Sequence, residues 1–284
     1  MTTIVYFNGD FVDKDAVRIS PDERGWLFGD GVYEVTPSYD GRFFCVDRHL
    51  ERLRRSLAEV RIMGIDVDAL RDVSVELLER NGLARSGRAI VYLQVTRGAA
   101  PRAHAFPTPA VPPTVYGYAA PFVPKVDPEQ GAAAITVPDI RWARCDIKSV
   151  ALLPNCLANQ EAREADAFEA IFVRDGMALE GTHTNLFAVI GGEVWTAPKT
   201  NYVLPGITRG VVLELCAEGR IPACERPVTL QALRRADEIF LAGTTTEVLP
   251  VVRLDGAPVG DGRPGAITRA LRTLFSDRVA RSTR

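Results

Sequence analysis

The stretch Asp139–Ser149, Asp-Ile-Arg-Trp-Ala-Arg-Cys-Asp-Ile-Lys-Ser, is the part of this 284-residue sequence around which the rest can be organised. Lysines and arginines together number 34, yet lysine occurs only at Lys14, Lys125, Lys148 and Lys199. Lysine is the cationic side chain that can lose its proton and hold an aldehyde as a Schiff base, which arginine cannot do. Taken alone, Lys148 also fits a solvent-exposed lysine at the end of a strand, so the surrounding sequence must decide.

The composition indicates an ordinary globular chain, with 46% apolar and 25% charged residues and a length that suits one large domain or two small ones. A net charge of -2 gives no electrostatic reason to expect nucleic acid or an anionic membrane as a partner. No apolar run approaches a membrane span, and the first ten residues do not resemble a signal peptide. The five cysteines form no CxxC pair, which favours reduced thiols in the cytoplasm. The three histidines are far apart in the sequence, so we expect no metal site.

Residues 1–120 read as a small domain of strands and two helices. Ile4–Phe7 and Phe11–Val12 flank a turn at Asn8-Gly9, which predicts a hairpin. A helix capped by Asp47 has an apolar face at helical spacing, made of Leu50, Leu53, Leu57 and Val60. Arg52 falls roughly 200° round that helix from Leu50, so the pattern alone places it in solvent.

A loop after the predicted strand Ile90–Thr96 carries Pro101-Arg102-Ala103-His104. If this segment is extended, Arg102 and His104 point to the same side, because side chains alternate along a strand. An arginine beside a histidine makes a good receptor for a carboxylate, although two solvated loop residues would look the same in the sequence.

Three prolines within residues 121–128 predict a linker, residues 121–130, before a second domain, residues 131–284. In that half a hairpin on Asp175-Gly176 ends at Glu180. Two short segments suit a phosphate: Gly206-Ile207-Thr208 at a predicted helix start, and Gly243-Thr244-Thr245-Thr246 after a strand. Each of these segments by itself also fits simple capping or turn chemistry.

Four motifs, taken in order, carry a family resemblance. They are Glu180-Gly181-Thr182, Asn185-Leu186-Phe187, Val194-Trp195-Thr196 and Leu204-Pro205-Gly206-Ile207-Thr208-Arg209. This ordered signature resembles that of the class IV aminotransferases, and the likeness covers essentially the whole chain. The resemblance implies pyridoxal 5'-phosphate as cofactor and an α+β, two-domain fold type IV. A smaller N-terminal α/β domain would precede a larger C-terminal domain with a β-barrel-like core.

Within the class, the sequence is most similar to bacterial D-amino acid transaminases. The shared segments are Phe28–Glu34, Val95–Gly98 leading to Pro101–His104, Asp139–Trp142 and Arg144–Ser149. In those enzymes the counterparts of Arg102 and His104, with a tyrosine matching Tyr33, bind the substrate α-carboxylate. The arginine and histidine come from the partner subunit, so the resemblance implies a homodimer acting on amino acids and 2-oxo acids.

The resemblance also assigns roles at the cofactor. Lys148 would hold its aldehyde and move the proton, and Glu180 would pair with the pyridine nitrogen, which keeps the ring an electron sink. Leu204 would pack on the ring face. The phosphate contacts would be Arg52, Ile207, Thr208 and Thr244, which reverses the solvated position that the helical pattern gives Arg52. His183 stands where the family usually has a small serine, and it either alters the cofactor's hydrogen bonds or points away.

Several alternatives remain at this stage. Branched-chain L-amino acid relatives carry a tyrosine five residues after the lysine, where this chain has Leu153, which argues against them. An aminodeoxychorismate lyase would eliminate pyruvate instead of transferring the amine, whereas Arg102 and His104 favour transfer on small α-amino acids. An (R)-selective amine transaminase would not need a carboxylate receptor. A non-catalytic module that binds the cofactor would not need both Lys148 and Glu180.

Overall fold

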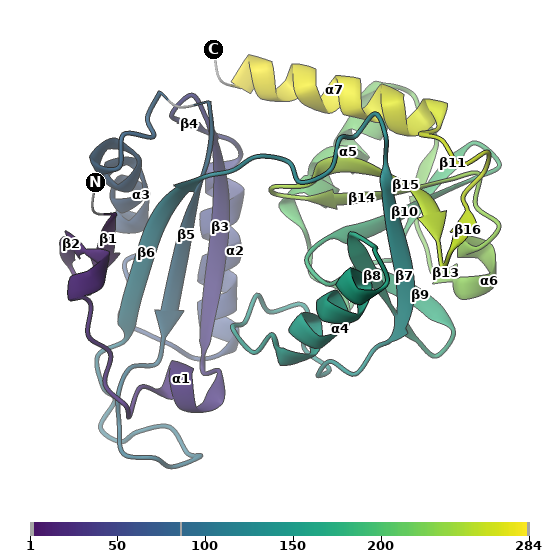
Figure 1. Ribbon diagram of the computed structural model, residues 1–284. Helices are drawn as coiled ribbons and strands as arrows, with labels where there is room; N and C mark the ends of the chain where they lie inside the picture. The colour runs from purple at the N-terminus through teal and green to yellow at the C-terminus, as the bar shows by residue number, and fades with distance from the viewer. Residues whose placement is uncertain (1–2, 86, 283–284) are drawn as a thin grey trace. The chain divides into compact units, whose positions relative to one another are not determined.

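The computed structural model describes residues 3–85 and 87–282, which divide into two compact units (Figure 1). The first unit comprises mainly Met1–Val123 and Ile147–Ala151, and the second Pro124–Asp146 and Leu152–Arg281. Residues 147–151 thus group with the first unit by their contacts, although they lie inside the range 131–284 that the sequence assigned to the second domain.

The described residues of the first unit form one six-stranded sheet and two long helices. Its strands are β1 (Ile4–Phe7), β2 (Asp10–Asp13), β3 (Gly31–Tyr39), β4 (Arg42–Phe43), β5 (Arg88–Thr96) and β6 (Thr114–Pro121). Its helices are α1 (Arg24–Phe28), α2 (Val46–Glu59) and α3 (Ala69–Arg80), with a single 3-10 turn, η1 (Lys14–Ala16). The strands pair antiparallel in the order β2-β1-β6-β5-β3-β4, and the hairpin expected at Asn8-Gly9 is confirmed. α2 begins at Val46, so Asp47 lies in its first turn and does not cap it, contrary to the prediction.

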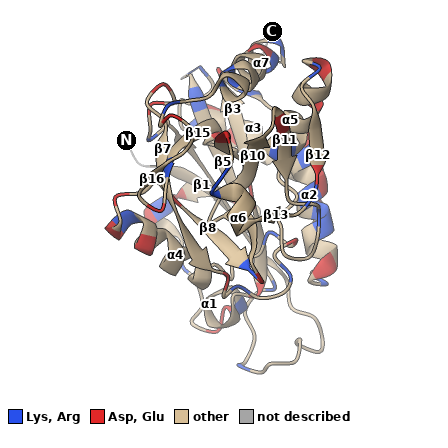
Figure 2. Cartoon of the chain, turned by 90° about the vertical axis from the view of Figure 1, so that its right-hand side faces the viewer, with Lys and Arg blue, Asp and Glu red and all other residues tan. Residues whose placement is uncertain are grey.

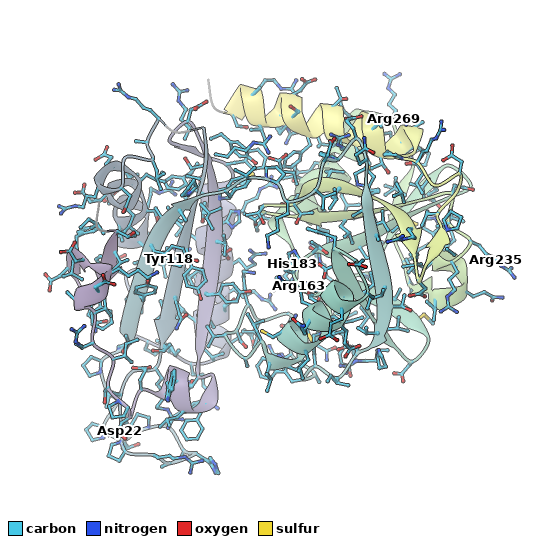
Figure 3. The ribbon with its side chains drawn as sticks, in the orientation of Figure 1. Asp22, Tyr118, Arg163, His183, Arg235 and Arg269 are labelled. Atoms are coloured by element: carbon cyan, nitrogen blue, oxygen red, sulfur yellow. The ribbon has the colours of Figure 1, made fainter. Side chains whose placement is uncertain are left out.

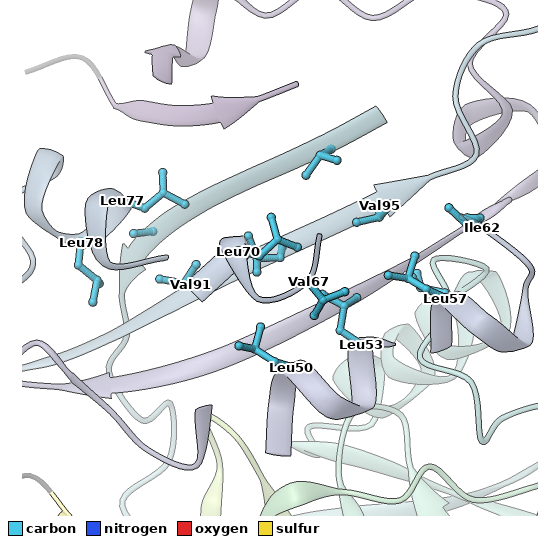
Figure 4. Packing of buried hydrophobic residues seen from close by; sticks show 14 of the residues in the cluster. Leu50, Leu53, Leu57, Ile62, Val67, Leu70, Leu77, Leu78, Val91 and Val95 are labelled. Atoms are coloured by element: carbon cyan, nitrogen blue, oxygen red, sulfur yellow. The ribbon is translucent and has the colours of Figure 1, made fainter. Parts of the chain in front are cut away.

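One face of this sheet packs against α2 and α3 (Figure 4). The predicted apolar face of α2 is confirmed: Leu50, Leu53 and Leu57 are buried at helical spacing. Along β5 the alternate residues Val91, Leu93 and Val95 join the same cluster, so the residues between them face the other side of the sheet.

The segment that carries Lys148 pairs with the end of β3. The Tyr33 amide donates to the Lys148 carbonyl at 2.9 Å, and the Val150 amide donates to the Gly31 carbonyl at 3.0 Å. A bridge between Val32 and Ser149 completes this short ladder. The backbone of Lys148 is therefore fixed opposite Tyr33 by hydrogen bonds.

The second unit has ten strands and four helices. The strands are β7 (Ala132–Pro138), β8 (Glu169–Arg174), β9 (Met177–Gly181), β10 (Asn185–Ile190), β11 (Glu193–Thr196), β12 (Ala223–Glu225), β13 (Val228–Thr229), β14 (Glu238–Gly243), β15 (Glu247–Leu254) and β16 (Ala257–Pro258). The helices are α4 (Leu153–Glu164), α5 (Ile207–Glu218), α6 (Leu230–Leu233) and α7 (Ala266–Ser282).

Six of these strands close into a mixed barrel. The path β10-β14-β15-β7-β8-β9 returns to its start because β10 also pairs with β9, at Asn185 and Glu180. β7 runs parallel to β15 and β8, and the other pairings in this ring are antiparallel. The predicted α+β fold with a β-barrel-like core is thereby confirmed. Because the closing pair is Glu180 with Asn185, the barrel fixes the position of Glu180.

The barrel strands and the helices around them bury a separate core. It includes Ile171, Leu186, Leu241 and Val251, while the small residues Ala158 and Ala162 let α4 pack closely on β7 and β8. Charged residues of both signs are interspersed over both units (Figure 2). Among the described residues, no helix is both long and apolar enough to cross a membrane.

Candidate active site

Lys148 is a partly exposed lysine between two buried neighbours. Ile147 and Ser149 are 6% and 7% exposed, and Ile147 belongs to the core of the first unit. The Lys148 Nζ lies 4.3 Å from the centre of the Tyr33 ring. Buried flanking residues and a paired backbone anchor the segment, while the Lys148 side chain itself stays partly exposed.

Tyr33 begins a row of tyrosines on the sheet face opposite the α2–α3 core. Tyr92 stacks on Tyr33 with ring centres 5.5 Å apart, and Tyr118 stacks on Tyr92 at 5.1 Å (Figure 3). The Tyr92 hydroxyl donates to the Gln94 side chain at 2.8 Å. Stacked rings with few rotatable bonds make a stiff wall, which holds the Tyr33 ring in place beside Lys148.

Arg52 is buried, 7% exposed, and forms an ion pair with Glu34. Its Nε and Nη2 donate to the two Glu34 oxygens at 2.9 and 2.6 Å, and the Nδ1 of His49 lies 2.9 Å from Glu34 Oε1. The solvated position suggested by the helical pattern is wrong, because Arg52 points back across α2 onto β3. Burial lowers the pKa of His49 despite the neighbouring carboxylate, which favours the neutral imidazole. Burial raises the pKa of Glu34, but Arg52 and His49 lower it more, and the net shift is downward.

In the second unit, the buried side chain of Glu180 accepts three hydrogen bonds. Arg141 Nη1 donates to its Oε1 at 2.6 Å, while the Leu204 amide and the Asn185 Nδ2 donate to its Oε2 at 3.0 and 3.1 Å. Arg141 is itself held by a bidentate pair with Asp139, at 2.9 and 3.0 Å. The carboxylate therefore has one orientation, fixed from three directions.

Burial raises the pKa of Glu180 to about 7, although Arg141 and the Leu204 amide lower it. In the protein alone the carboxyl is therefore half protonated near neutral pH. A positively charged ring nitrogen beside it would favour the ionised form. Such a poised, buried carboxyl suits pairing with a protonated heterocycle.

The start of α5 lies next to this carboxylate. Asn185 Nδ2 also donates to the Leu204 carbonyl at 2.9 Å, and a Cβ on Gly206 would lie 1.9 Å from Asn185 Oδ1, so only glycine fits there. No side chain caps α5 within the described residues. The first amides of α5, at Ile207 and Thr208, thus form an end that suits an anion.

The turn carrying Thr244 connects β14 to β15 close to the same residues. Asn185 pairs with Ala242 on β14, and Gly243 packs against Thr184. The segment that leads into α5 and the turn that carries Thr244 therefore both adjoin the strand pair that closes the barrel at Glu180 and Asn185.

Sequence reasoning gave no roles to Arg141, Asp139 and Asn185. Arg141 and Asp139 lie two residues apart in a segment quoted only for its family likeness, and an acidic and a basic residue at that spacing in extended chain can pair. Asn185 follows Glu180 by five residues. Only the closure of the barrel brings the two together.

His183 lies on the loop between β9 and β10, with its side chain partly exposed (Figure 3). Its Nδ1 lies 3.0 Å from the buried Glu169, and its ring packs edge-on against Phe168 at 5.6 Å. Glu169 also accepts from the hydroxyls of Thr182 and Thr184, at 2.6 and 2.8 Å. His183 therefore helps to hold this loop.

Arg102 and His104 are exposed on the loop after β5. Both contact the ring of Phe28: the Arg102 guanidinium at 5.3 Å and the His104 ring at 5.8 Å. The two side chains thus share one neighbour, the Phe28 ring. Among the described residues, neither side chain has a carboxylate partner.

Comparison with known protein families shows which family this chain belongs to. The model of amino-transferase class IV matches residues 31–254. The chain belongs to the class IV aminotransferases. It is 44% identical to a D-alanine aminotransferase of Staphylococcus haemolyticus over 96% of this chain and 97% of the relative. It is 41% identical to one of Bacillus licheniformis over 98% of each.

Solved structures of branched-chain amino acid aminotransferases share the fold. The branched-chain amino acid aminotransferase of Escherichia coli superposes with a TM-score of 0.90 at 26% identity, over 98% of this chain and 94% of that one. A second branched-chain amino acid aminotransferase, solved with pyridoxamine 5'-phosphate, gives 0.89 at 26% identity, over the same shares of the two chains. One from the archaeon Thermoproteus uzoniensis, solved with norvaline, gives 0.88 at 25% identity, over 99% of this chain and 96% of that one.

The cofactor of this class IV aminotransferase is pyridoxal 5'-phosphate. The residues described here fit it. Glu180 is a buried carboxyl with a raised pKa, and α5 begins without a side-chain cap. The described residues contain no group of three His, Cys, Asp or Glu that could hold a metal ion.

The pKa of Glu180 predicts how the stability of the cofactor-free protein depends on pH. Folding raises this pKa from 4.5 to about 7, so the folded form binds the proton more tightly. The free energy of unfolding should therefore fall as the pH rises through that interval, by about 3 kcal/mol. Urea unfolding between pH 4.5 and 8 should show this loss in the wild type but not in Glu180→Gln.

The exposed Glu164→Gln is the matched control and should behave like the wild type. Saturating pyridoxal 5'-phosphate should flatten the wild-type profile, because a positive charge beside Glu180 lowers its pKa. Equal pH profiles for the wild type and Glu180→Gln would contradict the assignment.

Proposed function

We propose that this aminotransferase transfers amino groups between D-amino acids of the D-alanine and D-glutamate type and 2-oxo acids, by a ping-pong mechanism. The pair Arg102 and His104 carries the proposal, because it is an exposed cationic receptor without a carboxylate of its own among the described residues. Identity of 44% to a D-alanine aminotransferase over nearly the whole chain supports it. Reduced cysteines, all five free, suit a cytoplasmic enzyme.

We assign the chemistry to Lys148 and Glu180. Bound pyridoxal 5'-phosphate supplies an aldehyde for the amine and a ring that accepts electrons from Cα. Lys148 Nζ is the group that would hold that aldehyde, and as a free amine it would accept the proton from the substrate Cα and later return it. Glu180 would stay ionised beside the ring nitrogen, with Arg141 holding its orientation.

The other proposed contacts hold the cofactor. We propose that the phosphate is bound by Arg52, by the start of α5 at Ile207 and Thr208, and by Thr244. Glu34 would fix the plane of the Arg52 guanidinium. Leu204 would pack on the ring face, since its backbone amide already contacts Glu180.

The proposed carboxylate receptor sets the stereochemistry. Lys148 can take the Cα proton only from the side that it reaches. Anchoring the α-carboxylate at Arg102, His104 and Tyr33 then leaves one place for the side chain, and only one enantiomer satisfies both conditions. We propose that this enantiomer is D.

We further propose a homodimer in which Arg102 and His104 serve the site of the partner subunit. The loop that bears them is exposed on the single chain, as a surface offered to a second copy would be. Symmetric dimers are the commonest assemblies, and each copy would give its loop to the other.

The branched-chain activity of the solved relatives is the second candidate, favoured by their TM-scores of up to 0.90. Their identity of 26% is well below the 44% to a D-alanine aminotransferase, and fold alone does not set the substrate. Leu153 is 70% exposed at the start of α4, the position at which the family resemblance implies a tyrosine in branched-chain enzymes. A lyase that releases pyruvate would turn over without a 2-oxo acid, which assays with and without 2-oxoglutarate would reveal.

Lys148→Ala should abolish the yellow absorbance of the bound cofactor and lower turnover by several orders of magnitude, because nucleophile and proton carrier are lost together. Absorbance spectra and steady-state assays with D-alanine and 2-oxoglutarate measure both effects. Lys199→Ala, which removes an exposed lysine, is the control. Normal turnover in Lys148→Ala would refute the assignment.

Arg102→Leu should lower kcat/KM for D-alanine and D-glutamate. The transition state should lose about 2–5 kcal/mol of stabilisation, the cost of removing one partner of a charge pair. It should affect (R)-1-phenylethylamine far less, because that amine has no carboxylate. Chiral chromatography of the alanine formed from pyruvate should give the D form. Arg235→Leu changes an exposed arginine elsewhere (Figure 3) and serves as control; L-alanine as product would overturn the proposal.

Mixing Lys148→Ala with Arg102→Leu tests whether the receptor crosses between subunits. In a mixed dimer, one site would combine the intact Lys148 of one copy with the intact Arg102 of the other. Random exchange should then restore about one quarter of the wild-type activity. If Arg102 served its own subunit, no mixed site would be complete and activity would stay at the level of the separate variants.

A further inference from the structure

The loop that carries Arg102 and His104 is held by a residue that the reaction does not use. Arg24 lies on α1, is 3% exposed, and points under the loop. Its Nη1 donates to the Ala103 carbonyl at 2.6 Å and to the Ala105 carbonyl at 3.4 Å, while its Nη2 donates to the His104 carbonyl at 3.4 Å. One guanidinium therefore binds three successive carbonyls of the loop.

Asp30 fixes the guanidinium of Arg24 from the other side. Arg24 Nε donates to Asp30 Oδ2 at 2.8 Å, and Arg97 forms a bidentate pair with the same carboxylate at 2.8 and 3.0 Å. Burial raises the pKa of Asp30, but the hydrogen bonds from Arg97 and Arg24 lower it more, so Asp30 stays ionised at neutral pH. The Arg24 amide also donates to the Gly98 carbonyl at 3.0 Å, which joins α1 to the start of the loop.

Phe28, on the same short helix, completes the support. Its ring lies 4.8 Å from the Arg24 guanidinium, 5.3 Å from that of Arg102 and 5.8 Å from the His104 ring. Arg24 thus binds the backbone carbonyls of the loop, while the side chains of Arg102 and His104 contact the ring of Phe28.

We propose that Arg24 is a positioning residue for substrate selection: it fixes the loop so that Arg102 and His104 meet an α-carboxylate without reordering. This inference rests on the proposed function, which makes those two residues the carboxylate receptor. A loop ordered in advance costs little entropy on binding. Arginine suits the role because its planar fork has five donors in fixed positions, whereas lysine has a single flexible ammonium.

The test compares Arg24→Met and Arg24→Lys with the wild type, each alone and combined with Arg102→Leu. Arg24→Met should lower kcat/KM for D-alanine about 10- to 100-fold, mainly through KM, because the receptor is displaced. Arg24→Lys, which can keep the ion pair with Asp30 but cannot bind three carbonyls, should give an intermediate loss. The cofactor absorbance should not change in either variant.

The double-mutant cycle separates positioning from general damage. If Arg24 acts through Arg102, Arg24→Met should add almost nothing to the loss already caused by Arg102→Leu. Equal losses with and without Arg102 would overturn the inference. If Arg102→Leu itself has no effect on D-alanine, the proposed function fails instead, so the two failures are distinguishable.

Hydrogen exchange gives a readout that does not depend on turnover. The amides of residues 102–106 should exchange faster in Arg24→Met and Arg24→Lys, while those of the central strand β5 keep the wild-type rate. Unchanged exchange in the loop would overturn the inference. Arg24→Lys keeps the test informative if Arg24→Met folds poorly.

Discussion

A charge buried in apolar surroundings must be paired, and this constraint organises the functional parts of both units. Glu180 is paired with Arg141, Arg52 with Glu34, and Arg24 with Asp30, and five of these six side chains are less than a tenth exposed. Removing one member would leave the other charge with fewer partners in a buried place, which would cost stability. Pairing thus fixes orientation as well as charge, which a site needs if its groups are to be in place before the substrate arrives.

The three pairs differ in how the pKa of the carboxyl group is shifted. Glu34 and Asp30 are more acidic than usual because each faces an arginine, and they remain anions at neutral pH. Glu180 has a single arginine, Arg141, which is shared with Asp139, and burial raises its pKa to about 7. Of the three carboxylates, Glu180 alone stands at the edge of titration, which is the condition for responding to a positive charge placed beside it.

The fold is common to enzymes with different substrates, so specificity depends on local parts. In the proposed assignment, the barrel end around Glu180 and the start of α5 would serve pyridoxal 5'-phosphate, the cofactor of the class. The loop held by Arg24 and the residue at Leu153 are where the proposed D-amino acid enzyme would differ from the branched-chain ones. Their backbones lie outside the regular strands, where sequence changes cost little stability.

The sequence by itself determined the local elements and the family. Helical spacing located the core face of α2, turn residues located the hairpins, and ordered motifs identified the family, from which the proposed roles of Lys148 and Glu180 follow. Local patterns suffice there because spacing and turn preferences act between residues near in the chain. They placed Arg52 in solvent, since its partner Glu34 lies on a strand 18 residues earlier. Three contacts were decided only by the tertiary structure. They are the ion pair of Arg52 with Glu34, the closure of the barrel at Glu180 and Asn185, and the hydrogen bonds of Arg24 to a loop 79 residues away. The first and the last of these join groups far apart in sequence, and the second depends on the whole ring of barrel strands. Such contacts are set by strand pairing and by the need to pair buried charges, neither of which a local pattern records.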